Sequence, residues 1–185
     1  MKKLHLQFNV GYLFHNRRIF MKRFPVACLA LLTLVHCRRV SDSSLMERAR
    51  EFESREKYTE AAALFEKVVH DYPESGLAPE ALYLASMIYS GRLEEHRRAV
   101  TLLERAISRY PSDPGSARCR FMIGFILSNS LSDTLKARQA YEAFLKDYPD
   151  HDLAPSVHWE LKYLGKDINE IPELRHLESP DSSDG

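Results

Sequence analysis

Cysteine, histidine, serine and the carboxylates perform most protein chemistry, and few of them stand at productive spacings in this sequence. It contains no glycine-rich phosphate loop, no two cysteines separated by two residues and no histidine pair at the spacing of a zinc-protease helix. His158 and Glu160 flank Trp159, but helical residues two positions apart point to different faces. Nothing places a serine on a strained turn that would expose it as a nucleophile. The sequence therefore predicts a protein that is not an enzyme and that uses no metal ion or cofactor.

Cys37 is the cysteine whose surroundings indicate a covalent role. An apolar run of twelve residues, 24–35, follows the basic pair Lys22 and Arg23. The run is too short to span a bilayer, which takes about 20 residues, and it fits the apolar part of an export signal, about 7–15 residues. Cys37 follows the run and precedes a polar stretch. This order predicts an export signal over residues 1–37.

Residues 34–37, Leu-Val-His-Cys, resemble the bacterial lipobox, in which a signal peptidase cleaves before a cysteine that then receives lipid. The resemblance implies that Cys37 is lipidated and that acyl chains attach the protein to a membrane. His36 stands where the lipobox has a small residue, so an ordinary export signal or an uncleaved stub stays open. Arg38 follows, where aspartate would imply retention at the inner membrane, so the implied destination is the outer membrane, facing the periplasm.

Two start sites for translation are open. A start at Met21 would leave residues 1–20 outside the protein. A start at Met1 would include residues 16–22, Asn-Arg-Arg-Ile-Phe-Met-Lys, which resemble the twin-arginine export signature. Both routes lead across the inner membrane, so the expected compartment is the same.

The charge of the chain is balanced overall but unevenly distributed. Of 26 basic and 26 acidic residues, six basic ones and no acids lie in residues 1–37, which leaves 20 basic and 26 acidic residues in the remainder. Nucleic-acid binding requires a cationic surface, so this acidic body predicts no nucleic-acid partner. Cys119 lies in an apolar segment and is interpreted as a buried, inert thiol.

The body of the chain repeats with a period of 38 residues. Tyr-Pro pairs recur at that spacing, with an alanine twelve residues before each proline and a large apolar residue eight before it. The three columns are Ala61, Ala99 and Ala137; Phe65, Leu103 and Tyr141; and Pro73, Pro111 and Pro149. Coincident columns at one period predict an array of structural repeats.

Each repeat predicts two helices. The apolar spacing of four, three and four residues lines one face of a helix, which the proline then prevents from continuing. A short polar stretch and a second amphipathic run follow each Tyr-Pro pair, and Pro79 and Pro155 suit a first helical turn. The predicted helices cover residues 43–55, 58–72, 77–90, 96–110, 115–129, 133–148 and 152–164. Asp133 is a candidate N-cap and Gly165 a candidate C-cap.

These columns resemble those of tetratricopeptide repeats, over residues 45–165. The resemblance implies an all-α fold: a right-handed superhelix of antiparallel helix pairs, with about seven helices. A linker over residues 38–44 would precede it, and an acidic, partly disordered tail over residues 166–185 would follow. Residues 61–89 and 137–166 are similar to the BamD-type outer-membrane assembly lipoproteins and to the Tol–Pal accessory periplasmic proteins.

The resemblance implies that the first helix of each repeat lines a concave groove, which would take an extended peptide or a partner helix. The groove positions would be Tyr89, Arg118, Phe121, Phe125 and Asn129. Packing between helices stays open for Tyr89 and Phe121. Trp159 is expected to close the end of the core, with a role as a docking anchor as the alternative.

The implied function is a non-enzymatic scaffold that binds other envelope proteins, in envelope or outer-membrane protein assembly. A soluble periplasmic adaptor, related to Tol–Pal or to the cell wall, is the alternative. A further alternative is an accessory subunit of an envelope enzyme.

Overall fold

The computed structural model describes residues 40–172 and residue 174, so the predicted export signal, Cys37 and most of the predicted tail lie outside the described residues. The described part consists of helices and contains no strand. Its elements are α3 (Asp42–Ser54), α4 (Tyr58–Asp71), α5 (Ala78–Gly91), α6 (His96–Arg109), α7 (Ser116–Asn129), α8 (Thr134–Asp147), α9 (Ala154–Tyr163) and the 3-10 helix η2 (Ile168–Glu170). The all-α prediction is confirmed, and the seven α-helices begin and end within two residues of the predicted positions.

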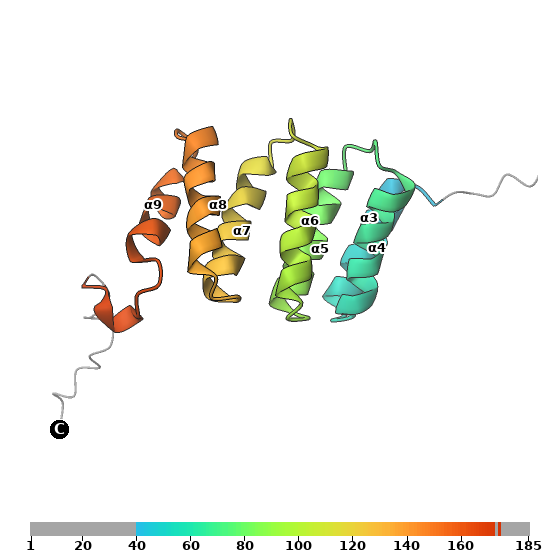
Figure 1. Ribbon diagram of the computed structural model, residues 1–185. Coiled ribbons are helices and arrows are strands. Elements are labelled where there is room, and N and C mark those ends of the chain that lie inside the picture. Colours follow the sequence, from blue (N-terminus) through green and yellow to red (C-terminus); the bar gives the residue numbers. More distant parts are fainter. Residues whose placement is uncertain (1–39, 173, 175–185) are drawn as a thin grey trace, which may run out of the picture. The chain divides into compact units, whose positions relative to one another are not determined.

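Each helix packs against the next one in the chain, from α3 to α9. The pairs α3–α4, α5–α6 and α7–α8 follow one another side by side, and α9 packs on α8 (Figure 1). We call α3, α5, α7 and α9 the first helices, and α4, α6 and α8 the second helices. In Figure 1, α6 and α8 lie in front of α5 and α7.

The tyrosine of each Tyr-Pro pair ends a second helix in the same way. Tyr72, Tyr110 and Tyr148 have ψ angles of 58°, 59° and 55°, because a residue before proline is disfavoured in the helical region. Two of the hydroxyls also join neighbouring segments. The Tyr110 hydroxyl donates to the Pro73 carbonyl oxygen at 2.7 Å, and the Tyr72 hydroxyl donates to the Val40 carbonyl oxygen at 2.6 Å.

Side-chain caps determine where two helices begin. Asp133 accepts a hydrogen bond from the Lys136 backbone N–H at 3.1 Å, as predicted for an N-cap. Ser41 accepts one from the Ser44 backbone N–H at 3.2 Å, so α3 begins inside the predicted linker of residues 38–44. Pro79 and Pro155 lie in the first turns of α5 and α9, as predicted.

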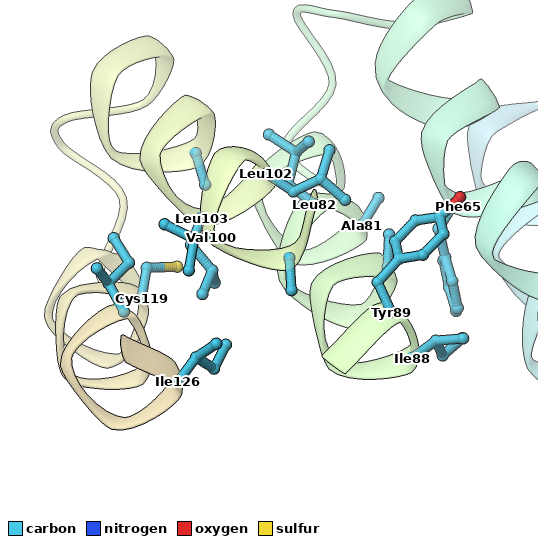
Figure 2. Packing of buried hydrophobic residues seen from close by; sticks show 14 of the residues in the cluster. Phe65, Ala81, Leu82, Ile88, Tyr89, Val100, Leu102, Leu103, Cys119 and Ile126 are labelled. Atoms are coloured by element: carbon cyan, nitrogen blue, oxygen red, sulfur yellow. The ribbon is translucent and has the colours of Figure 1, made fainter. Parts of the chain in front are cut away.

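The repeat columns form the core of the array. Figure 2 shows the buried apolar side chains gathered between neighbouring helices. The alanine column is fully buried, as is the large apolar column beside it: Ala61, Ala99, Ala137, Phe65, Leu103 and Tyr141. Alanine leaves room for a neighbouring helix, and the larger side chain fills the wider gap one turn further along.

Gly124 of α7 is a position at which the packing requires a glycine. A Cβ atom there would lie 2.4 Å from Cε1 of Tyr141, closer than two carbon atoms can approach. Tyr141 is fully buried in α8. The contact between α7 and α8 therefore depends on the missing side chain.

A glycine and a short 3-10 helix follow α9. Gly165 has a φ angle of +79°, which glycine adopts at little cost, so it supports the predicted helix end. η2 follows, and Ile171 is buried. The predicted tail from residue 166 therefore begins with an ordered segment, because an apolar side chain anchors it. No described helix is long and apolar enough to cross a membrane.

Candidate functional site

The first helices carry a row of aromatic residues in the repeat register. Tyr83 of α5, Phe121 of α7 and Trp159 of α9 are each 38 residues apart. Phe125 lies one turn after Phe121 on α7, and the centroids of the two rings are 6.3 Å apart. We call Tyr83, Phe121, Phe125 and Trp159 the aromatic face. Phe125 and Trp159 are 38% and 40% exposed, so two large aromatic side chains of this face reach the surface.

Helix α7 brings together four of the five residues predicted for a groove. Arg118, Phe121, Phe125 and Asn129 are spaced three, four and four residues apart, which places them on one side of the helix. Phe121 is only partly exposed, and its ring centroid lies 6.1 Å from that of Tyr141 in the core. Phe121 therefore both packs between helices and borders the surface.

Arg118 lies against the neighbouring first helix. The centre of its guanidinium is 3.9 Å from the centroid of the Tyr83 ring, within the range of a cation–π interaction. Burial raises the pKa of Tyr83, and the positive charge of Arg118 opposes that rise. No described carboxylate forms an ion pair with Arg118, whereas Arg50 of α3 is paired with Glu80 of α5 at 2.9 Å.

A pocket of about 600 Å³ lies between the C-terminal ends of α7 and α9. Trp159 and Tyr163 supply its aromatic wall, with ring centroids 4.6 Å apart. Its other lining residues are Ser128, Asn129, Ser132, Thr134, Glu160, Leu164, Gly165, Lys166, Asp167 and Ile171. Trp159 therefore lies at the edge of an open site, as the docking-anchor alternative would require, and Asn129 borders the same pocket.

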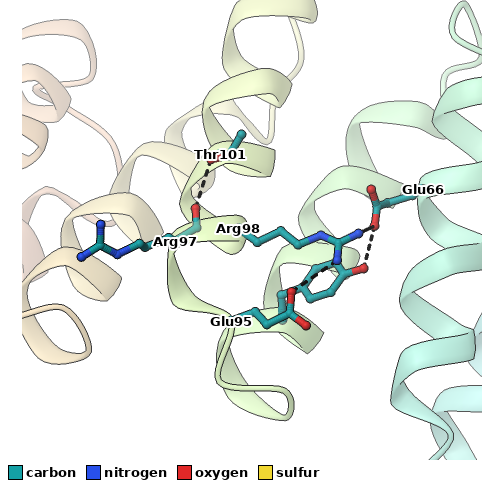
Figure 3. Close-up of polar contacts among 6 residues, drawn as sticks. Glu66, Glu95, Arg97, Arg98 and Thr101 are labelled. Carbon is teal, nitrogen blue, oxygen red and sulfur yellow. Dashed lines mark hydrogen bonds and ion pairs between the residues drawn. The ribbon is translucent and has the colours of Figure 1, made fainter.

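Tyr89, the fifth predicted groove residue, lies elsewhere. It is only 4% exposed, and its hydroxyl donates to Glu66 of α4 at 2.7 Å. Arg98 of α6 covers the ring at 4.0 Å and donates to the same carboxylate, and Figure 3 shows Arg98 and Glu66 pointing toward one another. Burial and the bond to Glu66 raise the pKa of Tyr89. The structure favours the packing alternative for Tyr89 over the groove position, because Arg98 and Glu66 enclose the ring between repeats.

The described residues offer little for covalent or metal chemistry. Cys119 is buried, as interpreted from the sequence, and burial raises the pKa of its thiol to about 11. A thiol that stays protonated is a poor nucleophile. Within residues 40–172 and 174, no cluster of His, Cys, Asp or Glu could hold a metal ion. What the arrangement offers is a surface for contact.

Sequence reasoning missed Tyr83 as a partner of Arg118, and it left Trp159 outside the groove set. Both residues occupy the repeat position of Phe121, so extending the 38-residue register from the second helices to the first helices would have found them. The pocket beside Trp159 is lined in part by Lys166, Asp167 and Ile171, and the sequence carried no signal for the path of this segment.

The stacked helix pairs define the class of the fold, a helical-repeat protein. Its first helices carry aromatic groups on a surface that another protein could contact. The model of the tetratricopeptide repeat matches residues 44–75, 80–113 and 118–151, which correspond to the three helix pairs and cover more than half of the chain. The chain therefore belongs to the tetratricopeptide repeat family. Such repeats generally mediate protein–protein binding, and the family typically serves as non-enzymatic scaffolds. A search of curated proteins found no match.

Proposed function

We propose that this protein is an interaction scaffold of the bacterial envelope that binds another envelope protein through the aromatic face. The observation that carries the proposal is the exposure of Phe125 and Trp159 on neighbouring first helices. Large aromatic side chains beside a pocket are frequent anchors in protein interfaces, where they bury much apolar area at low entropic cost. The helices beneath them pack against one another, which holds these side chains on one surface.

The proposed location is the outer membrane, with the repeats in the periplasm. The apolar run over residues 24–35 and Cys37 support this location, because an exported and lipidated cysteine would hold the protein at a membrane without a spanning helix. His36 favours a second candidate, a soluble periplasmic adaptor, since a bulky residue before the cysteine would hinder cleavage. Mass spectrometry of the mature N-terminus separates them: an acylated Cys37 supports the anchored form, and a terminus without lipid supports the soluble one.

The proposed process is envelope or outer-membrane protein assembly, with Tol–Pal coordination and cell-wall work as alternatives. The support is the likeness of residues 61–89 and 137–166 to the envelope lipoproteins and periplasmic proteins named above. A role as an accessory subunit of an envelope enzyme would use the same face.

The binding role is tested by a pull-down from solubilised envelope membranes, with the bound proteins quantified by mass spectrometry. Phe125→Ser and Trp159→Ser should each reduce recovery of the partner at least about tenfold, as expected for anchor residues. Leu135→Ser is the matched control, because Leu135 is also an exposed apolar residue but lies on a second helix, α8. Equal recovery with all three variants would contradict binding through the aromatic face.

A further inference from the structure

We infer that the segment bound by the aromatic face is acidic: it brings a carboxylate to Arg118 and a bulky apolar side chain to Phe125 and Trp159. This inference rests on the proposed function, because it specifies the chemistry of the partner at the same site. It follows from the charges and contacts of three helices, α5, α7 and α9.

Arg118 is held in a position to bind an anion. The guanidinium lies over the ring of Tyr83, and this contact restricts the side chain before any partner arrives. The guanidinium carries its N–H donors in one plane, a geometry that can receive a carboxylate through two parallel hydrogen bonds. Arg118 is exposed, so a partner can reach it.

No described carboxylate forms an ion pair with this positive charge, although the carboxylate of Asp113 lies nearby. Helix α7 contains no Asp or Glu, and the one acid of α5, Glu80, is paired with Arg50. Asp113, in the turn before α7, accepts the Gly115 backbone N–H at 2.8 Å and makes no ion pair with Arg118. A partner with a carboxylate would therefore add a direct ion pair that the protein itself does not form.

The acids at the other end of the site already have donors. Glu160 accepts the hydroxyl of Tyr141 at 3.3 Å, and Asp167 accepts the backbone N–H of Asn169 at 3.0 Å. A basic segment would thus meet carboxylates that are partly satisfied, and it would be repelled by Arg118. An acidic segment would be attracted by Arg118 and would meet no carboxylate on α7 itself.

The distance between Arg118 and Phe125 along α7 limits the spacing of the acidic and apolar residues in the partner segment. Arg118 and Phe125 are seven residues apart, which corresponds to roughly 10 Å along the helix axis. An extended peptide covers that distance in about three residues, at roughly 3.3 Å each. The partner should therefore carry its acidic residue and its apolar anchor about three positions apart if extended, or about two turns apart if helical.

The test uses synthetic peptides of twelve residues with the full protein. The acidic probe has a pair of glutamates three residues before a pair of phenylalanines, in a serine and glycine background. Its neutral twin has glutamines in place of the glutamates, and its basic twin has lysines. Binding is followed by calorimetry and by the fluorescence of Trp159, the single tryptophan of the chain.

The acidic probe should bind at least about tenfold more tightly than the neutral twin, and the basic twin should bind more weakly than both. Higher salt should reduce this preference, because the contact is exposed. Arg118→Gln should remove the preference for acid and leave the neutral twin unaffected. Arg105→Gln, which makes the same change on the exposed surface of α6, should keep it.

Equal binding of the acidic and neutral probes, or binding of none, would overturn the inference, as would a preference that survives Arg118→Gln. These failures are distinguishable from failure of the proposed function. If Phe125→Ser releases the envelope partner but the wild type shows no preference for acid, the site is right and the partner chemistry is wrong. If Phe125→Ser and Trp159→Ser retain the partner, the proposed site itself is wrong.

Discussion

At the scale of single residues, the absence of a side chain at Gly124 allows α7 to pack closely against Tyr141 of α8. Alanine usually stabilises the interior of a helix by about 0.5–1 kcal/mol relative to glycine. In Gly124→Ala, however, the new Cβ would meet the fully buried ring of Tyr141, so we expect a net loss of about 1–3 kcal/mol in the free energy of unfolding. Urea denaturation followed by circular dichroism measures this loss. Gly91→Ala is the control, because a Cβ there has open space, and it should be neutral or stabilising.

Cys119 gives a second prediction at this scale. Its pKa of about 11 leaves roughly one thiol in a thousand ionised at pH 8. In a chain whose Cys28 and Cys37 are changed to serine, we expect no measurable reaction with a disulfide reagent over an hour in the folded state. Full reaction should follow within minutes of unfolding in urea. Fast labelling of the folded chain would mean that α7 opens readily or that the thiol is accessible.

At the scale of elements, the Tyr-Pro pairs do more than end the second helices. The Tyr110 hydroxyl bonds the Pro73 carbonyl oxygen of the preceding repeat, so it joins two units of the array. Tyr110→Phe should lower the free energy of unfolding by about 1 kcal/mol, the usual net value of one such bond. Tyr148→Phe should have a smaller effect, since its hydroxyl makes no hydrogen bond to a described residue. Equal melting temperatures for the two variants would contradict the joining role.

The helices could be predicted from the sequence because the signals for them are local. The period of the alanine and aromatic columns, the Tyr-Pro pairs and Asp133 each act within one helix or at its end. Exposure is decided by other helices. Tyr89 and Phe125 are both aromatic residues of first helices, yet Tyr89 is enclosed by Glu66 and Arg98, which lie 23 residues before it and nine after it. No periodicity within α5 carries that information.

At the scale of the whole molecule, stability should depend on α9, because each unit of a repeat array is supported only by its neighbours. α9 buries Val157 completely and packs on α8, and Glu160 bonds Tyr141. A chain that ends at Asp150 would expose that side of α8 to water. We expect its melting temperature to fall and its helical signal to decrease by more than the ten residues of α9, since the third repeat would unfold with it.

A chain that ends at Leu174 is the matched control for this truncation. It keeps α9, η2 and the buried Ile171, so it should melt at the temperature of the full chain. The comparison separates the support given by α9 from any effect of the residues that follow. The chain ending at Asp150 could instead lose only the helical signal of α9 and melt at the same temperature. In that case α9 would not stabilise the other repeats. The aromatic face would then include a residue, Trp159, on an element that the array does not need.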